Sequence, residues 1–305
     1  MSIDVVIRQK GFFKKDLPLK TILGNNLSYG AFDGLRLETG VMKGSEFIAY
    51  NSSHIGRGFS VNYDRSKPNE ITLRLLNPTS NEELHDFYQC IGRIVDHWKC
   101  DLEVDGEQTT PSDFQKGLPW VRKCNARYLL DMAEEICSGK SGNLTLFSAF
   151  WPLAVGKPEA ELFKVEGVDA FRDWMHKKQS IDAYYAKPRF FLLNRSAIGR
   201  YVITENTLSI FPLKGCVPFG VVDPKTNEPL KCEIYEMWFY STSEKMMLGG
   251  VPYEKFFESI HHGKISRYDA EHVLVKPIPY AEMNRILTAF SKESAHSEGE
   301  EDDKG

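Results

Sequence analysis

Carboxylates alternate with apolar residues between Asp101 and Gly106, a spacing that could bind a cation. In a calcium loop of the D-x-[DN]-x-[DN]-G type, Asp101, Glu103 and Asp105 would supply oxygen ligands before a sharp glycine turn. However, the position that must supply a bidentate carboxylate is Ser112. The alternation also fits a half-buried β-strand that ends in an ordinary turn. The sequence therefore favours a strand and predicts no metal site, with the three acidic residues as weak candidates for one.

A second candidate site is the segment His54-Ile-Gly56-Arg57-Gly58. Backbone N–H groups beside the glycines, together with the guanidinium, could hold a carboxylate or a phosphate. His54 and Arg57 are therefore candidate anion-binding residues. A tight connection between strands that end at Tyr50 and begin at Phe59 explains the glycines equally well, because glycine adopts turn conformations freely.

The sequence contains no complete catalytic motif. G-x-S-x-G, H-E-x-x-H, C-x-x-C and G-x-G-x-x-G are all absent,. His261, His262 and His272 could supply imidazoles to a metal, but paired histidines followed by Gly263 are typical of a helix C-terminus. We therefore expect no cofactor. A catalytic site assembled from distant loops stays open.

The distribution of charge argues against bulk nucleic-acid binding. Residues 291–305 hold six acidic and two basic residues, which leaves 36 of each sign in the rest of the chain. Such a balanced body lacks the positive field that supplies non-specific affinity for nucleic acid. Aromatic and basic residues interleave between Tyr184 and Tyr201, as single-strand binding would need. The continuous apolar run 190–193 instead predicts a buried strand.

The elements that must position these residues are strands and amphipathic helices. Residues 71–76 alternate as a strand, and residues 80–98 follow as a helix with a capping box at Ser80 and Glu83. The order continues with a strand at 101–105, a helix at 120–138 and a strand at 143–147. The sequence thus predicts an α+β fold with mixed, largely antiparallel sheets, packed amphipathic helices and at least one βαβ-like unit.

The pattern restarts after residue 150. Residues 158–187 read as a helix, and strands then dominate. We predict an α+β N-terminal half over 1–150 and an α+β C-terminal half over 151–290. The acidic residues 291–305 have no aromatic side chain. They are predicted to form a disordered tail, because they cannot bury enough apolar surface to offset the entropy of ordering.

Composition points to the cytoplasm. The first 15 residues have no apolar core of signal-peptide length, because Asp4, Arg8 and Lys10 interrupt it,. The longest uncharged run, between Lys140 and Lys157, is 16 residues and contains a proline. This falls short of the roughly 20 apolar residues that a spanning helix needs. Six cysteines without zinc-type spacing favour reduced thiols,.

Three segments resemble a known family: MSIDVVIRQKGFFKKDLPLKTILGNNLSYG, NSSHIGRGFSV and LRLLNPTSNEELHDFY. They are similar to an uncharacterised bacterial family, the domain of unknown function numbered four thousand two hundred and ninety-nine. The family is about as long as the body of this chain. The resemblance implies a bacterial, cytosolic protein and implies no activity, cofactor or site residue.

The sequence favours a non-enzymatic cytosolic protein that binds another protein, in an accessory or immunity-type role. An aromatic content of 12% could furnish the anchors of an interface,. The alternative is a hydrolase, with or without a metal, whose groups come from distant loops. We expect neither a membrane partner nor bulk nucleic acid, and the sequence leaves the oligomeric state open.

Overall fold

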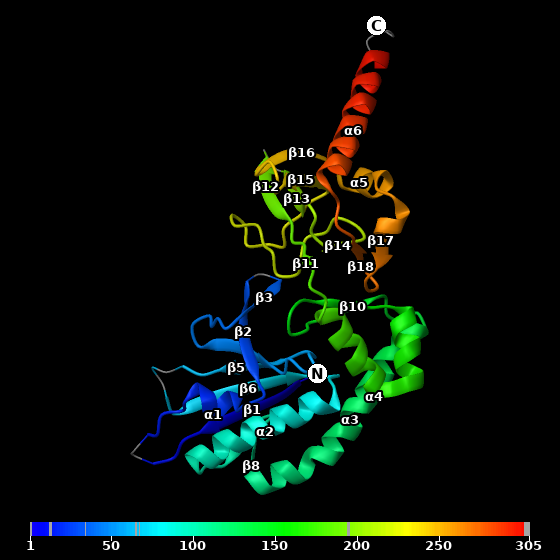
Figure 1. Cartoon of the computed structure of the whole chain (residues 1–305). Helices are drawn as coiled ribbons and strands as arrows, with labels where there is room; N and C mark the ends of the chain where they lie inside the picture. Colours follow the sequence, from blue (N-terminus) through cyan, green and yellow to red (C-terminus); the bar gives the residue numbers. More distant parts are fainter. Residues whose placement is uncertain are drawn as a thin grey trace. The chain divides into compact units, whose positions relative to one another are not determined.

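The computed structural model describes residues 2–11, 14–33, 35–64, 66, 68–193 and 196–301. The chain forms two compact units, residues 1–181 (unit 1) and 182–305 (unit 2) (Figure 1). Unit 1 thus extends past the boundary expected near residue 150. The cause is a pair of long helices, α3 (Pro111–Cys137) and α4 (Lys157–Gln179), which pack against each other.

Unit 1 is built on an eight-stranded sheet with the order β3-β2-β4-β5-β6-β1-β7-β8. Its elements besides α3 and α4 are β1 (Ser2–Arg8), α1 (Leu19–Leu23), β2 (Ser28–Asp33), β3 (Arg36–Thr39), β4 (Glu46–Tyr50), β5 (Phe59–Asn62), β6 (Glu70–Leu76), α2 (Asn81–Trp98), β7 (Leu102–Val104), β8 (Glu107–Thr109), β9 (Leu144–Leu146) and β10 (Leu153–Val155). The last two form a separate hairpin.

The predicted α+β class and βαβ-like unit are confirmed. β1 pairs antiparallel with both β6 and β7, so β6 and β7 run parallel to each other with one strand between them. α2 makes the connection from β6 to β7 and lies along one face of the sheet (Figure 1). Its apolar stripe packs there, and Phe87 meets Phe59 of β5 edge to face. The apolar residues whose periodicity predicted the helix therefore form the surface that packs against the sheet,.

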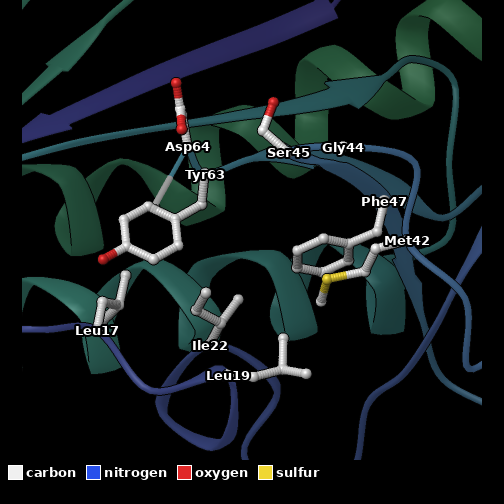
Figure 2. Close-up of a pocket in the computed structure, with 9 residues that line it drawn as sticks. All are labelled: Leu17, Leu19, Ile22, Met42, Gly44, Ser45, Phe47, Tyr63 and Asp64. Atoms are coloured by element: carbon white, nitrogen blue, oxygen red, sulfur yellow. The ribbon is translucent and has the colours of Figure 1, made fainter. Parts of the chain in front are cut away.

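A small apolar hollow lies between α1 and the sheet of unit 1. It measures about 200 Å³. Figure 2 shows the rings of Tyr63 and Phe47 on one side of it and Ile22 and Leu19 on the other, while the Asp64 carboxylate points away. Carbon atoms form most of these walls. The hollow is thus a loosely packed part of the core and offers little to a polar ligand.

Unit 2 contains two four-stranded sheets, with the orders β11-β14-β18-β17 and β12-β13-β15-β16. Its elements are β11 (Tyr184–Tyr185), β12 (Arg189–Leu193), β13 (Ser196–Thr204), β14 (Ser209–Pro212), β15 (Ile234–Ser241), β16 (Met246–Pro252), α5 (Tyr253–Ser259), a 3-10 turn (His262–Lys264), β17 (Ile265–Arg267), β18 (His272–Val275) and α6 (Tyr280–Glu301). α5 and α6 join residues of both sheets in one apolar core.

Three element boundaries differ clearly from those the sequence predicts. The helix expected over 120–138 already begins at Pro111, where the Thr110 side chain caps it. The helix expected over 158–187 ends at Gln179, because Tyr184 and Tyr185 pair with β14 as a short strand. Near the C-terminus of the chain, α6 continues through Glu301. It thus covers most of the segment 291–305 that was predicted to be a disordered tail. Residues 302–305 of that segment lie outside the described residues.

Candidate functional site

The predicted anion-binding segment forms the connection between β4 and β5. The N–H groups of Arg57 and Gly58 point at one carboxylate, that of Glu83 in the first turn of α2. The distances are 3.0 Å to Oε2 and 2.5 Å to Oε1. The hydroxyl of Thr79 donates a further hydrogen bond to Oε2. The N–H pair that the sequence suggested for an external anion therefore holds an internal one.

The Arg57 side chain is buried as well. Its guanidinium donates to the carbonyl oxygens of Phe147, at 2.9 Å, and of Asn77, at 3.0 Å. Burial lowers the pKa of Arg57 to about 10. This arginine connects three segments of unit 1. Because its side chain is buried, a ligand in solution cannot reach it.

Glu83 fulfils only half of the predicted capping box. Its N–H donates to the Ser80 hydroxyl at 3.0 Å, as expected. Its carboxylate turns to the Arg57 segment instead of back to the helix end. Burial raises the pKa of Glu83, against the opposing effect of the three hydrogen bonds and of Arg57. The start of α2 is thereby fastened to the β4–β5 connection.

His54 lies apart from this arrangement. Its Nε2 is 2.8 Å from Oδ2 of Asp86, a buried carboxylate. Asp86 also accepts from the side-chain amides of Asn26, at 2.6 Å, and Asn51, at 3.0 Å. His54 and Arg57 thus have separate partners, and the structure does not bring their side chains to one anion site.

The acidic segment forms β7 and the turn of a hairpin with β8. Asp105 and Gly106, at the turn, have φ angles of 50° and 88°. Asp101 forms an ion pair with Lys10 at 2.9 Å, and Glu103 forms one with Arg8 at 2.7 Å. Asp105 accepts the N–H of Asp4 at 2.9 Å. The strand interpretation is confirmed, and each of the three carboxylates has a different partner.

We accordingly expect calcium to leave the thermal stability of the protein unchanged. The described residues contain no group of three metal-binding side chains, and a hairpin holds alternate carboxylates on one edge rather than around an ion. The measurement is a thermal shift with calcium, magnesium, manganese and zinc. A rise in melting temperature that Asp101→Ala abolishes would contradict this expectation.

A different candidate surface lies in unit 2, on the sheet β12-β13-β15-β16. The residues Tyr201, Ile203 and Met237 point to the core beneath α5 and α6. The residues between them point the other way, because side chains alternate along a strand. We call this second side the open face; it comprises Phe191, Ile198, Arg200, Val202, Ile234, Glu236 and Trp238.

The open face is apolar at one end. Phe191, Ile198 and Ile234 stand opposite one another in register across β12, β13 and β15. Phe191 is 43% exposed and Ile234 is 52% exposed. The sequence predicted a buried strand for residues 190–193, and this was wrong for Phe191 and for Leu192, which is 48% exposed. The reason is that β12 is an edge strand, which only β13 pairs with among the described strands.

The centre of the open face is held in place by Arg200. Its guanidinium lies 4.6 Å from the ring centre of Phe191 and 4.5 Å from that of Trp238. Its Nε donates to Glu236 at 2.8 Å, and the Trp238 indole donates to the same carboxylate oxygen at 2.7 Å. Stacking and charge pairing together restrict all four side chains. The result is a surface whose central side chains hold one another rigidly in place.

One positive charge at the edge, that of Arg189, has no ion-pair partner among the described residues. Arg189 stands opposite Arg200 in register. Arg200 is neutralised by Glu236 on its other side, whereas Arg189 forms no ion pair with any described residue. The basic and aromatic composition of this region is visible in the sequence, but its arrangement is not, because the strand order is set by tertiary contacts.

Two of the remaining predicted ligands, His272 and His261, also have internal partners. Nδ1 of His272 is 2.9 Å from the buried Asp269, and its Nε2 is 2.9 Å from the hydroxyl of Tyr185. His261 accepts the N–H of Gly263 in the turn after α5. The histidines therefore serve two different local structures of unit 2.

Within the described part of the chain, no helix is long and apolar enough to cross a bilayer.

Comparison with known proteins gives one kind of match. A protein-family model described as "Domain of unknown function (DUF4299)" matches residues 2–286. This agrees with the resemblance of the three sequence segments. No curated protein and no solved structure matches the chain.

Proposed function

The chain belongs to the DUF4299 family, and since that description names no activity, we propose from the open face that the protein binds a protein partner. It acts without catalysis, as an accessory or immunity-type protein of the bacterial cytoplasm. All six cysteines are free thiols, which supports a reducing compartment,. The observation behind the proposal is the exposed edge strand β12 beside a rigid aromatic surface.

The partner segment that fits β12 is extended and acidic. An edge strand has a row of backbone N–H and C=O groups that can pair with another strand. Arg189 supplies a cation without a partner among the described residues, so an opposing carboxylate is favoured there,. Phe191 and Ile234 supply apolar contacts on the same face. Aromatic and arginine side chains are the commonest anchors of protein interfaces.

A hydrolase, the alternative function, is not favoured by the same contacts. His54, Arg57 and the acidic segment would have to converge on one substrate. Each instead has its own internal partner, respectively Asp86, backbone carbonyls, and the residues of β1 and the segment after it.

The proposal is tested by affinity capture with the full-length protein from native lysate. Phe191→Asp and Arg189→Glu should each reduce retention of the partner about tenfold, because both alter the anchors of the edge. The matched control is Val165→Asp, which places the same acid at an exposed apolar position of α4. Equal retention by Phe191→Asp and the control would overturn the proposal, as would a wild-type protein that retains no reproducible partner.

A further inference from the structure

Unit 1 contains a second cavity that none of the interactions above explains. It has a volume of about 540 Å³ and lies between α3, the middle of α2 at Tyr88, and the β7–β8 hairpin. This size is typical of sites for small organic ligands. One face of α3 lines it with Phe114, Gly117, Trp120 and Tyr128. We call it the α3 pocket.

The interior of the α3 pocket is aromatic. Tyr88 and Phe114 stack in parallel, with ring centres 4.1 Å apart. Burial raises the pKa of Tyr88 to about 12, as expected beside apolar neighbours. Tyr128 and Trp120 complete the aromatic lining, and the Trp120 side chain is 69% exposed. An indole with this exposure on the surface of a helix has a large ring face available for contact.

The charged residues of the pocket all have the same sign. Asp105, Glu107 and Asp113 lie on its rim, and no lysine, arginine or histidine is among the residues that line it. Asp105 and Asp113 accept hydrogen bonds from neighbouring groups, and Asp113 pairs with the exposed Lys116 at 3.1 Å. Glu107 forms no ion pair with a described residue. The rim therefore favours a cation.

From these contacts we propose that the α3 pocket binds a small organic amine, with its ammonium group at the acidic rim and its apolar body against the aromatic rings. Aromatic faces attract ammonium groups through the ring quadrupole, most strongly for tryptophan. The carboxylates add a favourable field, and the accessible rings of Trp120 and Tyr128 receive the apolar part, backed by the buried pair Tyr88 and Phe114. An anion of equal shape is excluded by repulsion from the same rim. This site is independent of the open face of unit 2.

Three probes of similar shape test the charge requirement: 2-phenylethylamine, 2-phenylethanol and 3-phenylpropanoate. Binding to the full-length protein is followed through the indole N–H signal of Trp120 in a two-dimensional NMR spectrum. The amine should shift this signal at millimolar concentration, and the neutral and anionic probes should bind at least about fivefold more weakly. Equal shifts from all three probes, or none from the amine, would overturn the proposal.

Variants of α3 and the hairpin locate the site. Glu107→Gln should weaken the amine about threefold, while Glu134→Gln, which removes an equal charge elsewhere on α3, should leave it unchanged. Gly117→Leu should weaken binding at least about tenfold, because a Cβ there meets open space and the larger side chain takes up room at the lining of the pocket,. This variant should not lower the melting temperature, since leucine favours a helix more than glycine does. Retained binding in a folded Gly117→Leu protein would place the amine elsewhere.

Discussion

Replacing Glu83 with alanine is expected to lower the free energy of unfolding of unit 1 by about 3–5 kcal/mol. The carboxylate is buried and accepts hydrogen bonds from the N–H groups of Arg57 and Gly58 and from the Thr79 hydroxyl. Alanine would leave these donors unsatisfied and the Arg57 guanidinium buried without a nearby negative charge,. It would also separate the start of α2 from the β4–β5 connection.

Urea unfolding followed by tryptophan fluorescence measures this effect. Four of the five tryptophans lie in unit 1, so the signal reports mainly on that unit. Glu134→Ala is the control, because it removes an exposed carboxylate of α3 and should change the stability by less than about 0.5 kcal/mol. A loss for Glu83→Ala no greater than that of the control would show that the buried carboxylate does not fasten α2.

The same residue predicts a pH dependence. Burial raises the pKa of Glu83 above its ordinary value of 4.5. Between pH 4.5 and the raised pKa of the folded state, the folded protein binds the proton more readily than the unfolded chain does. The free energy of unfolding therefore falls as pH rises through this window. Glu83→Gln lacks this contribution. The difference in unfolding free energy between wild type and Glu83→Gln should therefore change from pH 4.5 upward, and a constant difference would contradict the assignment.

Replacing Asp269 with alanine should destabilise unit 2 by about 3 kcal/mol. Asp269 is fully buried, and its Oδ1 accepts the N–H groups of Glu271 and His272 and faces Nδ1 of His272. Three donors would lose their acceptor, and His272 would lose the contact that orients it toward Tyr185.

Hydrogen exchange in β18 and β14 is the measurement for Asp269→Ala, because His272 is the first residue of β18. These amides should exchange faster by about two orders of magnitude if the opening of this sheet costs about 3 kcal/mol less. Glu233→Ala, an exposed carboxylate before β15, is the control. Unchanged exchange in β18 for Asp269→Ala would mean that the buried carboxylate does not support this sheet.

Local patterns predicted the elements of unit 1 well. The alternation of β6 and the apolar stripe of α2 each correspond to a buried face. The spacing of Leu102 and Val104 correctly predicted a strand and not a calcium loop, because a period of two is typical of a strand,. These features depend on residues close together in the chain. A local sequence pattern therefore contains most of the interactions that decide them.

Features that depend on distant residues were not predictable. The Arg57 segment suggested an anion site, but the anion proved to be Glu83, which no local pattern connects with that loop. Phe191 and Leu192 read as core, yet they are exposed because a long connection brings β15 beside β13 and leaves β12 at the edge. The α3 pocket is likewise assembled from α2, α3 and a hairpin, so its aromatic and acidic residues are scattered along the sequence.

The most direct test of the proposed protein-binding function is site-specific photo-cross-linking from β12. A benzophenone side chain at position 191 replaces the exposed Phe191 of the open face, and one at position 165 replaces an exposed valine of α4. The open face predicts a cross-link from position 191 to an extended, acidic segment of one partner, and none from position 165. Absence of a cross-link from position 191, or equal cross-linking from both positions, would contradict a partner on the open face.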